Sequence, residues 1–140
     1  MDDIVLMEAR KHGIGIVLSG STDRVGSLVT WMGRVYVVID INATPAEQRC
    51  TAMHEIAHHV LGHPIPRNDT EYEALEIAAD RWAAKRLIPD DLLADALERA
   101  RDRRELAEIL MVDPKTLDAR HRPAREQQSS SCLFLVPQVV

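Results

Sequence analysis

One helix-forming segment near the middle of the chain constrains the fold more than any other. Thr44 and Glu47 fit a capping box, and Pro45 occupies the first helical position. Gly62 stands where a helix commonly ends. Between these signals apolar side chains recur at helical spacing, namely Ala52, Met53, Ile56, Ala57, Val60 and Leu61. The sequence therefore predicts an amphipathic helix from residue 45 to about residue 61.

This helix carries the pattern H-E-x-x-H, formed by His54, Glu55 and His58. At about 3.6 residues per turn the two histidines lie one turn apart, so their rings can converge on one ion. Two imidazoles suit Zn²⁺, and Glu55, beside a zinc-bound water, can take its proton, as in a metallopeptidase. The alternative is a helix with two surface histidines, or with histidines in hydrogen-bonded core positions. The surrounding sequence has to decide between them.

A second helix is predicted over Glu71–Leu87, with Thr70 as its cap and Pro89 after its end. A catalytic zinc ion usually takes three protein ligands, so this helix is the place to look for the third. Glu76 and Asp80 lie one turn apart, which suits a carboxylate ligand and an outer partner that orients a ligand histidine. The alternative for these acids is a solvated helix face.

Residues 50–63 read CTAMHEIAHHVLGH and residues 76–89 read EIAADRWAAKRLIP, and together they resemble the ImmA/IrrE family of metallopeptidases. That family pairs an H-E-x-x-H helix ending in Gly-His with a second helix of the form E-x-x-A-(D/N)-x-(aromatic)-A. The likeness spans roughly residues 26 to 120. By this resemblance His54, His58 and Glu76 are the ligands of one Zn²⁺. Glu55 is then the general base that activates the zinc-bound water, and Asp80 stands where the family has Asp or Asn.

The resemblance also implies a fold and an activity. The fold is α+β: a minimal zincin-like core with a small sheet and two active-site helices, followed by C-terminal helices. The activity is that of a zinc-dependent endopeptidase cutting a transcriptional repressor or another regulator in a phage or mobile element. Two chemical candidates for stabilising the oxyanion are Tyr72 and His63.

The residues before the central helix predict a short helix over 2–11 and three strands. The strands are expected at 14–18, 26–31 and 34–39, because β-branched residues gather there between glycine-rich and polar clusters. A two-residue joint, Met32-Gly33, predicts a tight hairpin between the last two. We therefore expect a small, mostly antiparallel sheet whose strand over 34–39 is a candidate edge for holding a substrate backbone.

Beyond residue 90 the sequence predicts another amphipathic helix and then a pattern similar to a helix-turn-helix over residues 105–120. In that pattern Asp113 caps the second helix, and Lys115, Thr116 and Arg120 are the candidate DNA contacts. Met111 occupies the turn position at which such motifs favour glycine. Packing of this pair against the core, or recognition of a protein substrate, are the alternatives.

Three parts are predicted: a zincin-like core over residues 1–100, a helical segment over 101–125 and a flexible tail over 126–140. The tail is predicted from a Gln- and Ser-rich stretch followed by apolar residues without helical or alternating spacing.

Composition narrows the partners and the compartment. The net charge of −5 gives no broad electrostatic footprint for nucleic acid, although basic residues slightly outnumber acidic ones over 98–125. There is no signal-peptide pattern and no apolar run of the roughly 18 residues that a membrane span needs. Cys50 and Cys132 are interpreted as unpaired thiols of a cytoplasmic protein.

The predicted partner is accordingly a protein substrate, a repressor or an antitoxin-like regulator, and not a membrane. The competing hypothesis is a non-proteolytic regulatory module that binds DNA or a repressor and holds a structural zinc ion. A component of a toxin–antitoxin pair is a further alternative.

Overall fold

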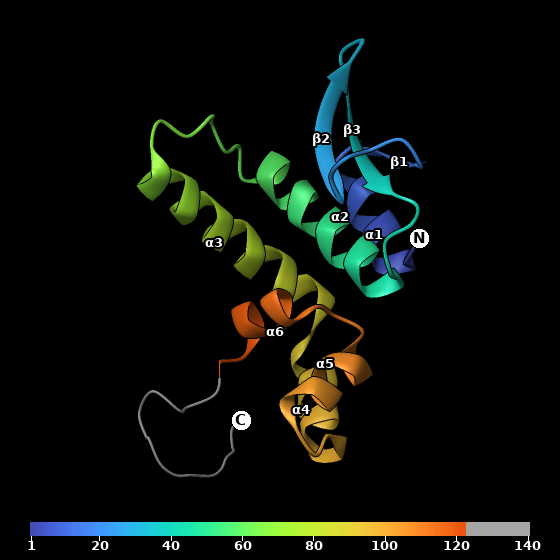
Figure 1. The fold of residues 1–140 in the computed structure, drawn as a ribbon, viewed down its shortest axis with the longest axis vertical. Helices are drawn as coiled ribbons and strands as arrows, with labels where there is room; N and C mark the ends of the chain where they lie inside the picture. Colours follow the sequence, from blue (N-terminus) through green and yellow to red (C-terminus); the bar gives the residue numbers. More distant parts are fainter. Residues whose placement is uncertain (123–140) are drawn as a thin grey trace.

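A small sheet stands at one end of the molecule and helices make up the rest in the computed structural model, which describes residues 1–122 (Figure 1). The fold is α+β, as predicted. The predicted tail over 126–140 lies outside the described residues. The elements in chain order are α1 (Asp3–Lys11), β1 (Gly15–Ser19), β2 (Gly26–Trp31), β3 (Arg34–Asp40), α2 (Pro45–Val60), α3 (Asp69–Leu87), α4 (Asp90–Arg99), α5 (Arg103–Leu110) and α6 (Pro114–Arg120).

The sheet has the strand order β1-β3-β2 and is mixed rather than mostly antiparallel. β2 and β3 form the expected antiparallel hairpin, but β1 pairs with β3 in parallel. β1 and β2 lie on opposite sides of β3, so the link over residues 20–25 carries the chain from one edge of the sheet to the other. β3 is therefore central, and the expectation that its edge is open to a substrate is wrong. The outer strands are β1 and β2.

The predicted tight turn joins β2 to β3. Met32 and Gly33 both have positive φ, 51° and 77°. Positive φ at both central residues is typical of the type I′ turn, whose twist matches that of the flanking strands and which favours Asn-Gly. Met32 is thus a non-glycine residue in the left-handed region, and its side chain is 83% exposed, so burial offsets little of the strain.

Met32→Asn is expected to raise the free energy of unfolding by roughly 1 kcal/mol, because asparagine adopts this conformation more readily than methionine. Met32→Val is expected to lower it, since a β-branched residue is a poorer fit at positive φ. Chemical denaturation of the two variants beside the wild type measures both effects. An asparagine variant less stable than the wild type would contradict this assignment of strain.

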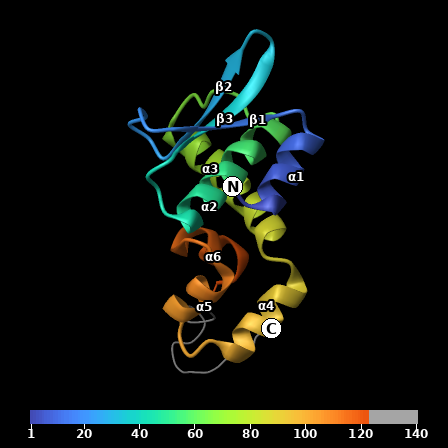
Figure 2. The same ribbon diagram turned by 90° about the vertical axis from the view of Figure 1, so that its right-hand side faces the viewer.

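α2 begins and ends as the sequence predicts. The Thr44 hydroxyl accepts from the Glu47 amide at 3.1 Å, and the Glu47 carboxylate accepts from the Thr44 amide at 2.9 Å, which completes the capping box. The helix packs on β2 and β3, and α1 lies on the same side of the sheet (Figure 2). Its fully buried side chains include Ala52, Met53, Ile56 and Ala57.

Gly26 brings β2 close to α2. A Cβ at this position would lie 2.4 Å from Cγ2 of Thr51 and 2.9 Å from Cδ1 of Ile39. Real Cβ atoms do not approach this closely, so a side chain here would push β2 away from the helix turn just before His54. The absence of a side chain at Gly26 thus sets the distance between the sheet and the helix that bears the histidines.

α3 starts two residues earlier than predicted. Its cap is Asn68, whose side chain accepts from the Glu71 amide at 2.8 Å, and not Thr70. Asparagine is among the best capping residues, and the extended backbone of Asn68 is the conformation that a cap requires. The helix packs on α2 and on α6, and its buried side chains are mostly small, Ala79, Ala83 and Ala84 among them.

The three last helices share the core of the rest of the molecule. Leu93, Leu106 and Leu117 belong to the same hydrophobic cluster as Val37 and Met53. The Arg49 guanidinium of α2 adds a polar link, donating to the carbonyls of Leu110 and Met111 at 3.1 and 2.9 Å.

This arrangement agrees with packing of the helix-turn-helix-like pair against the core, although the division of the chain at residue 100 stays a prediction. Among the described residues, no helix combines the length and the apolar character needed to cross a bilayer.

Candidate metal centre

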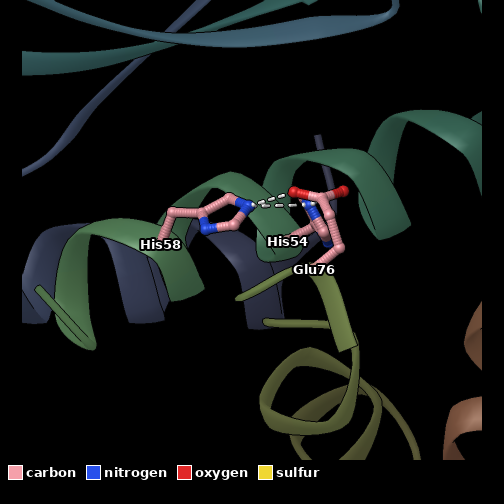
Figure 3. Close-up of side chains that lie close together, drawn as sticks. All are labelled: His54, His58 and Glu76. Carbon is pink, nitrogen blue, oxygen red and sulfur yellow. Dashed lines mark hydrogen bonds and ion pairs between the residues drawn. The ribbon is translucent and has the colours of Figure 1, made fainter. Parts of the chain in front are cut away.

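Three side chains from two helices converge between α2 and α3 (Figure 3). Nε2 of His58 lies 3.0 Å from Nε2 of His54 and 2.8 Å from Oε2 of Glu76. Oε1 of Glu76 lies 3.2 Å from Nε2 of His54. The histidines meet because they are four residues apart on α2, and Glu76 reaches them because α3 packs alongside.

The outer nitrogen of each ring has its own partner. Nδ1 of His54 lies 2.7 Å from Oδ1 of Asp80, one turn after Glu76 on α3. Nδ1 of His58 lies 2.8 Å from Nδ1 of His63, which follows the end of α2. A neutral ring that donates through Nδ1 presents an unprotonated Nε2 on its other side. Both lone pairs then point at the same place as the Glu76 carboxylate.

This donor set fits a metal ion. Ligands about 2.0–2.2 Å from zinc at the corners of a tetrahedron lie roughly 3.3 Å apart, close to the 2.8–3.2 Å between these atoms. Two lone pairs and a carboxylate facing one another repel unless a cation lies between them. His₂Glu with one position left over is the ligand set of a catalytic rather than a structural zinc site.

The electrostatics of the site also favour a positive charge. Burial lowers the pKa of His54, but the hydrogen bond and charge of Asp80 and the charges of Glu76 and Glu55 outweigh it, so the pKa lies above its ordinary value. At His63 burial and the neighbouring ring of His58 lower the pKa, which favours a neutral ring able to accept a hydrogen bond.

Glu55, the predicted base, is half-buried on α2 and near enough to influence His54. It stays outside the group of three converging side chains, as expected for a residue rotated about 100° from His54. Of the two oxyanion candidates, Tyr72 is exposed one turn before Glu76, whereas His63 is engaged with His58.

Cys50 lies outside the group of three converging side chains. Its sulfur accepts from the Asp113 amide at 3.4 Å, and burial raises the pKa of the thiol. The cysteine therefore serves as a buried contact between α2 and the start of α6 and not as a ligand of the converging group.

The candidate DNA contacts are in different environments. Thr116 is 5% exposed, and Arg120 donates to the carbonyl of Ile88 at 2.7 Å and pairs with Asp90. Lys115, with 64% of its side chain exposed, is the one of the three that faces solvent. Its Nζ lies 3.8 Å from Oδ1 of Asp80. Both residues line a pocket of about 390 Å³, together with Ile77, Arg81, Asp118 and Arg122.

Two of the three candidate side chains, Thr116 and Arg120, are thus engaged in contacts within the chain. The helix α6 therefore offers little surface for reading a DNA groove. Contact of Lys115 with DNA stays a prediction.

The fold and the His₂Glu group together define a metallopeptidase-type protein with a candidate metal site. The family model described as the IrrE N-terminal-like domain, Peptidase_M78, matches residues 9–127. That match covers most of the chain, and the chain belongs to this family. A search of curated proteins found no match.

Among the outer partners of the two histidines, Asp80 was predicted and His63 was not. The signal for His63 was present in the sequence, since Gly62 predicts a helix end that folds the next residue back over the last turn. What sequence reasoning lacked was the direction of the His63 ring.

Proposed function

We propose that this chain is a zinc-dependent endopeptidase that cuts a regulatory protein. In this proposal His54, His58 and Glu76 hold one Zn²⁺, Glu55 is the general base and Asp80 orients His54. The observation that carries it is the convergence of two imidazole nitrogens and a carboxylate within 3.2 Å of one another, with both outer nitrogens already partnered. Zinc, when bound there, would polarise the scissile carbonyl and make a water more acidic.

Glu55 would take the proton of the attacking water and later deliver it to the leaving amine. A carboxylate suits both steps because, once it has taken the proton of water, it holds an acidic O–H that it can donate to the leaving amine. Asp80 would keep the proton of His54 on Nδ1, so that the inner nitrogen remains able to bind metal.

The substrate backbone is best accommodated along the outer edge of β2. An edge strand has unpaired amides and carbonyls, and an extended peptide can add to them as a further strand. β2 is preferred over β1 because Gly26 packs β2 against Thr51, just before His54 on the metal-binding helix. β1, the other outer strand, contacts α1 instead.

The proposed substrate class is a repressor or antitoxin-like regulator, as the resemblance to the ImmA/IrrE family implies. The test is incubation of the zinc-loaded chain with repressors and antitoxin-like regulators from the same genome, followed by mass spectrometry of the products. We expect one or a few defined cuts, loss of cleavage with a zinc chelator and recovery on adding zinc. A zinc-loaded, folded chain that leaves the regulator intact but binds it would favour the non-proteolytic module instead.

A further inference from the structure

The end of α2 has a specific hydrogen-bond pattern that positions His63. The amide of Gly62 donates to the carbonyl of His59 at 3.1 Å, and the amide of His63 donates to that of His58 at 3.1 Å. With Gly62 at φ +67°, these are the two bonds of a Schellman motif. The motif folds the residue after the glycine back onto the last full turn, where an apolar contact is usual.

Here both residues of that contact are histidines. The ring centroids of His58 and His63 lie 5.0 Å apart with the planes at 66°, and the two Nδ1 atoms are 2.8 Å apart. A contact of this length between two ring nitrogens requires one donor and one acceptor. The way in which α2 ends therefore produces a polar contact to one of the candidate metal ligands.

We propose that His63 is a positioning residue for His58. This rests on the proposed metal site, because Nε2 of His58 must be unprotonated to bind metal, which leaves the proton of the neutral ring on Nδ1. Nδ1 of His63 then accepts a hydrogen bond from Nδ1–H of His58, and the His63 ring carries its own proton on Nε2. The bond fixes both the tautomer and the orientation of the His58 ring.

The two ligand histidines are thus oriented by different means. His54 has a carboxylate partner, Asp80, from the neighbouring helix, whereas His58 has a neutral ring from its own helix end. The second arrangement depends on the backbone at Gly62, because the positive φ of this residue folds His63 back onto the last turn of α2. Metal binding should consequently respond to a change at Gly62, although this residue offers no side chain to the site.

The test is the zinc affinity of His63 variants in the full chain, measured by competition with a chromophoric chelator. His63→Leu puts an apolar side chain at the position where a Schellman motif usually has one but removes the acceptor, and we expect zinc affinity to fall by about 10- to 100-fold. His63→Asn retains an acceptor oxygen and should recover part of the loss. His59→Ala, which changes the exposed neighbouring histidine, is the matched control and should bind zinc as the wild type does.

The results separate this proposal from the metal site itself. Wild-type affinity in His63→Leu, or equal losses in the Leu and Asn variants, would overturn the hydrogen-bond role while leaving the metal site standing. A wild-type chain that binds no zinc would overturn both. Absorption spectra of the cobalt-loaded proteins provide a second readout, since a displaced His58 ring changes the ligand geometry around the ion.

Gly62→Ala tests the backbone part of the inference. A Cβ at Gly62 would meet no atom within 4 Å, so the substitution disturbs only the preference for positive φ. We expect it to lower zinc affinity as well as stability. Gly33→Ala is the control, because Gly33 also has positive φ and open space but lies in the β2–β3 turn. Its variant should lose stability and keep zinc affinity; equal affinities in both variants would contradict the inference.

Discussion

Glu55→Gln is expected to keep zinc bound and to lose peptidase activity by about 10²- to 10⁴-fold, the usual contribution of a general base. Glutamine has nearly the same shape as glutamate but cannot take a proton from water. The metal should stay because Glu55 is not among the three side chains that converge on the site. Rates of cleavage of the regulator and zinc content of the same preparation measure the two parts together.

The control for this variant is Glu73→Gln, which removes an exposed acid on α3 and should change neither quantity. Glu55→Gln protein that cuts at the wild-type rate would contradict the role of Glu55. Loss of zinc in this variant would instead make Glu55 part of the ligand set, which the geometry does not favour.

Glu76→Ala is expected to lower zinc affinity by more than the roughly 10- to 100-fold that loss of an outer partner costs. Both oxygens of Glu76 face a histidine, at 3.2 Å to His54 and 2.8 Å to His58. Removing them leaves only two protein ligands, whereas catalytic zinc sites usually have three. Chelator competition measures the change, with Glu73→Ala on the same helix as the control. Wild-type affinity in Glu76→Ala would show that another group is the third ligand.

Most of the candidate site could be predicted because its signals are local. The capping box at Thr44, the glycine at position 62 and the spacing of His54 and His58 all act within one helix, where spacing in sequence determines spacing in space. Glu76 and Asp80 required in addition that two helices pack side by side. The family resemblance supplied that information, and the contacts of both residues with the α2 histidines agree with it.

The features that sequence reasoning missed depend on choices between nearly equal local signals or on long-range packing. Asn68 and Thr70 are both good caps two residues apart, and only the path of the chain selects Asn68. The parallel pairing of β1 with β3 is not encoded in either strand, because alternation of apolar residues does not reveal strand direction.

The helix-turn-helix pattern illustrates how similar sequences can serve packing. Met111 adopts φ +55° at the end of α5, so the turn does require the conformation for which glycine is usual. Asp113 caps α6 as predicted. Yet Thr116 and Arg120 point into contacts with the rest of the chain, which no local pattern reveals.

The most direct test of the central claim is the zinc content of the purified chain, measured by mass spectrometry of the metal against protein concentration after dialysis with zinc. The ligand geometry predicts about one zinc ion per chain, removable by chelation and absent in His58→Ala. A chain that is folded by circular dichroism and holds no zinc under these conditions would contradict the claim that His54, His58 and Glu76 form a metal site.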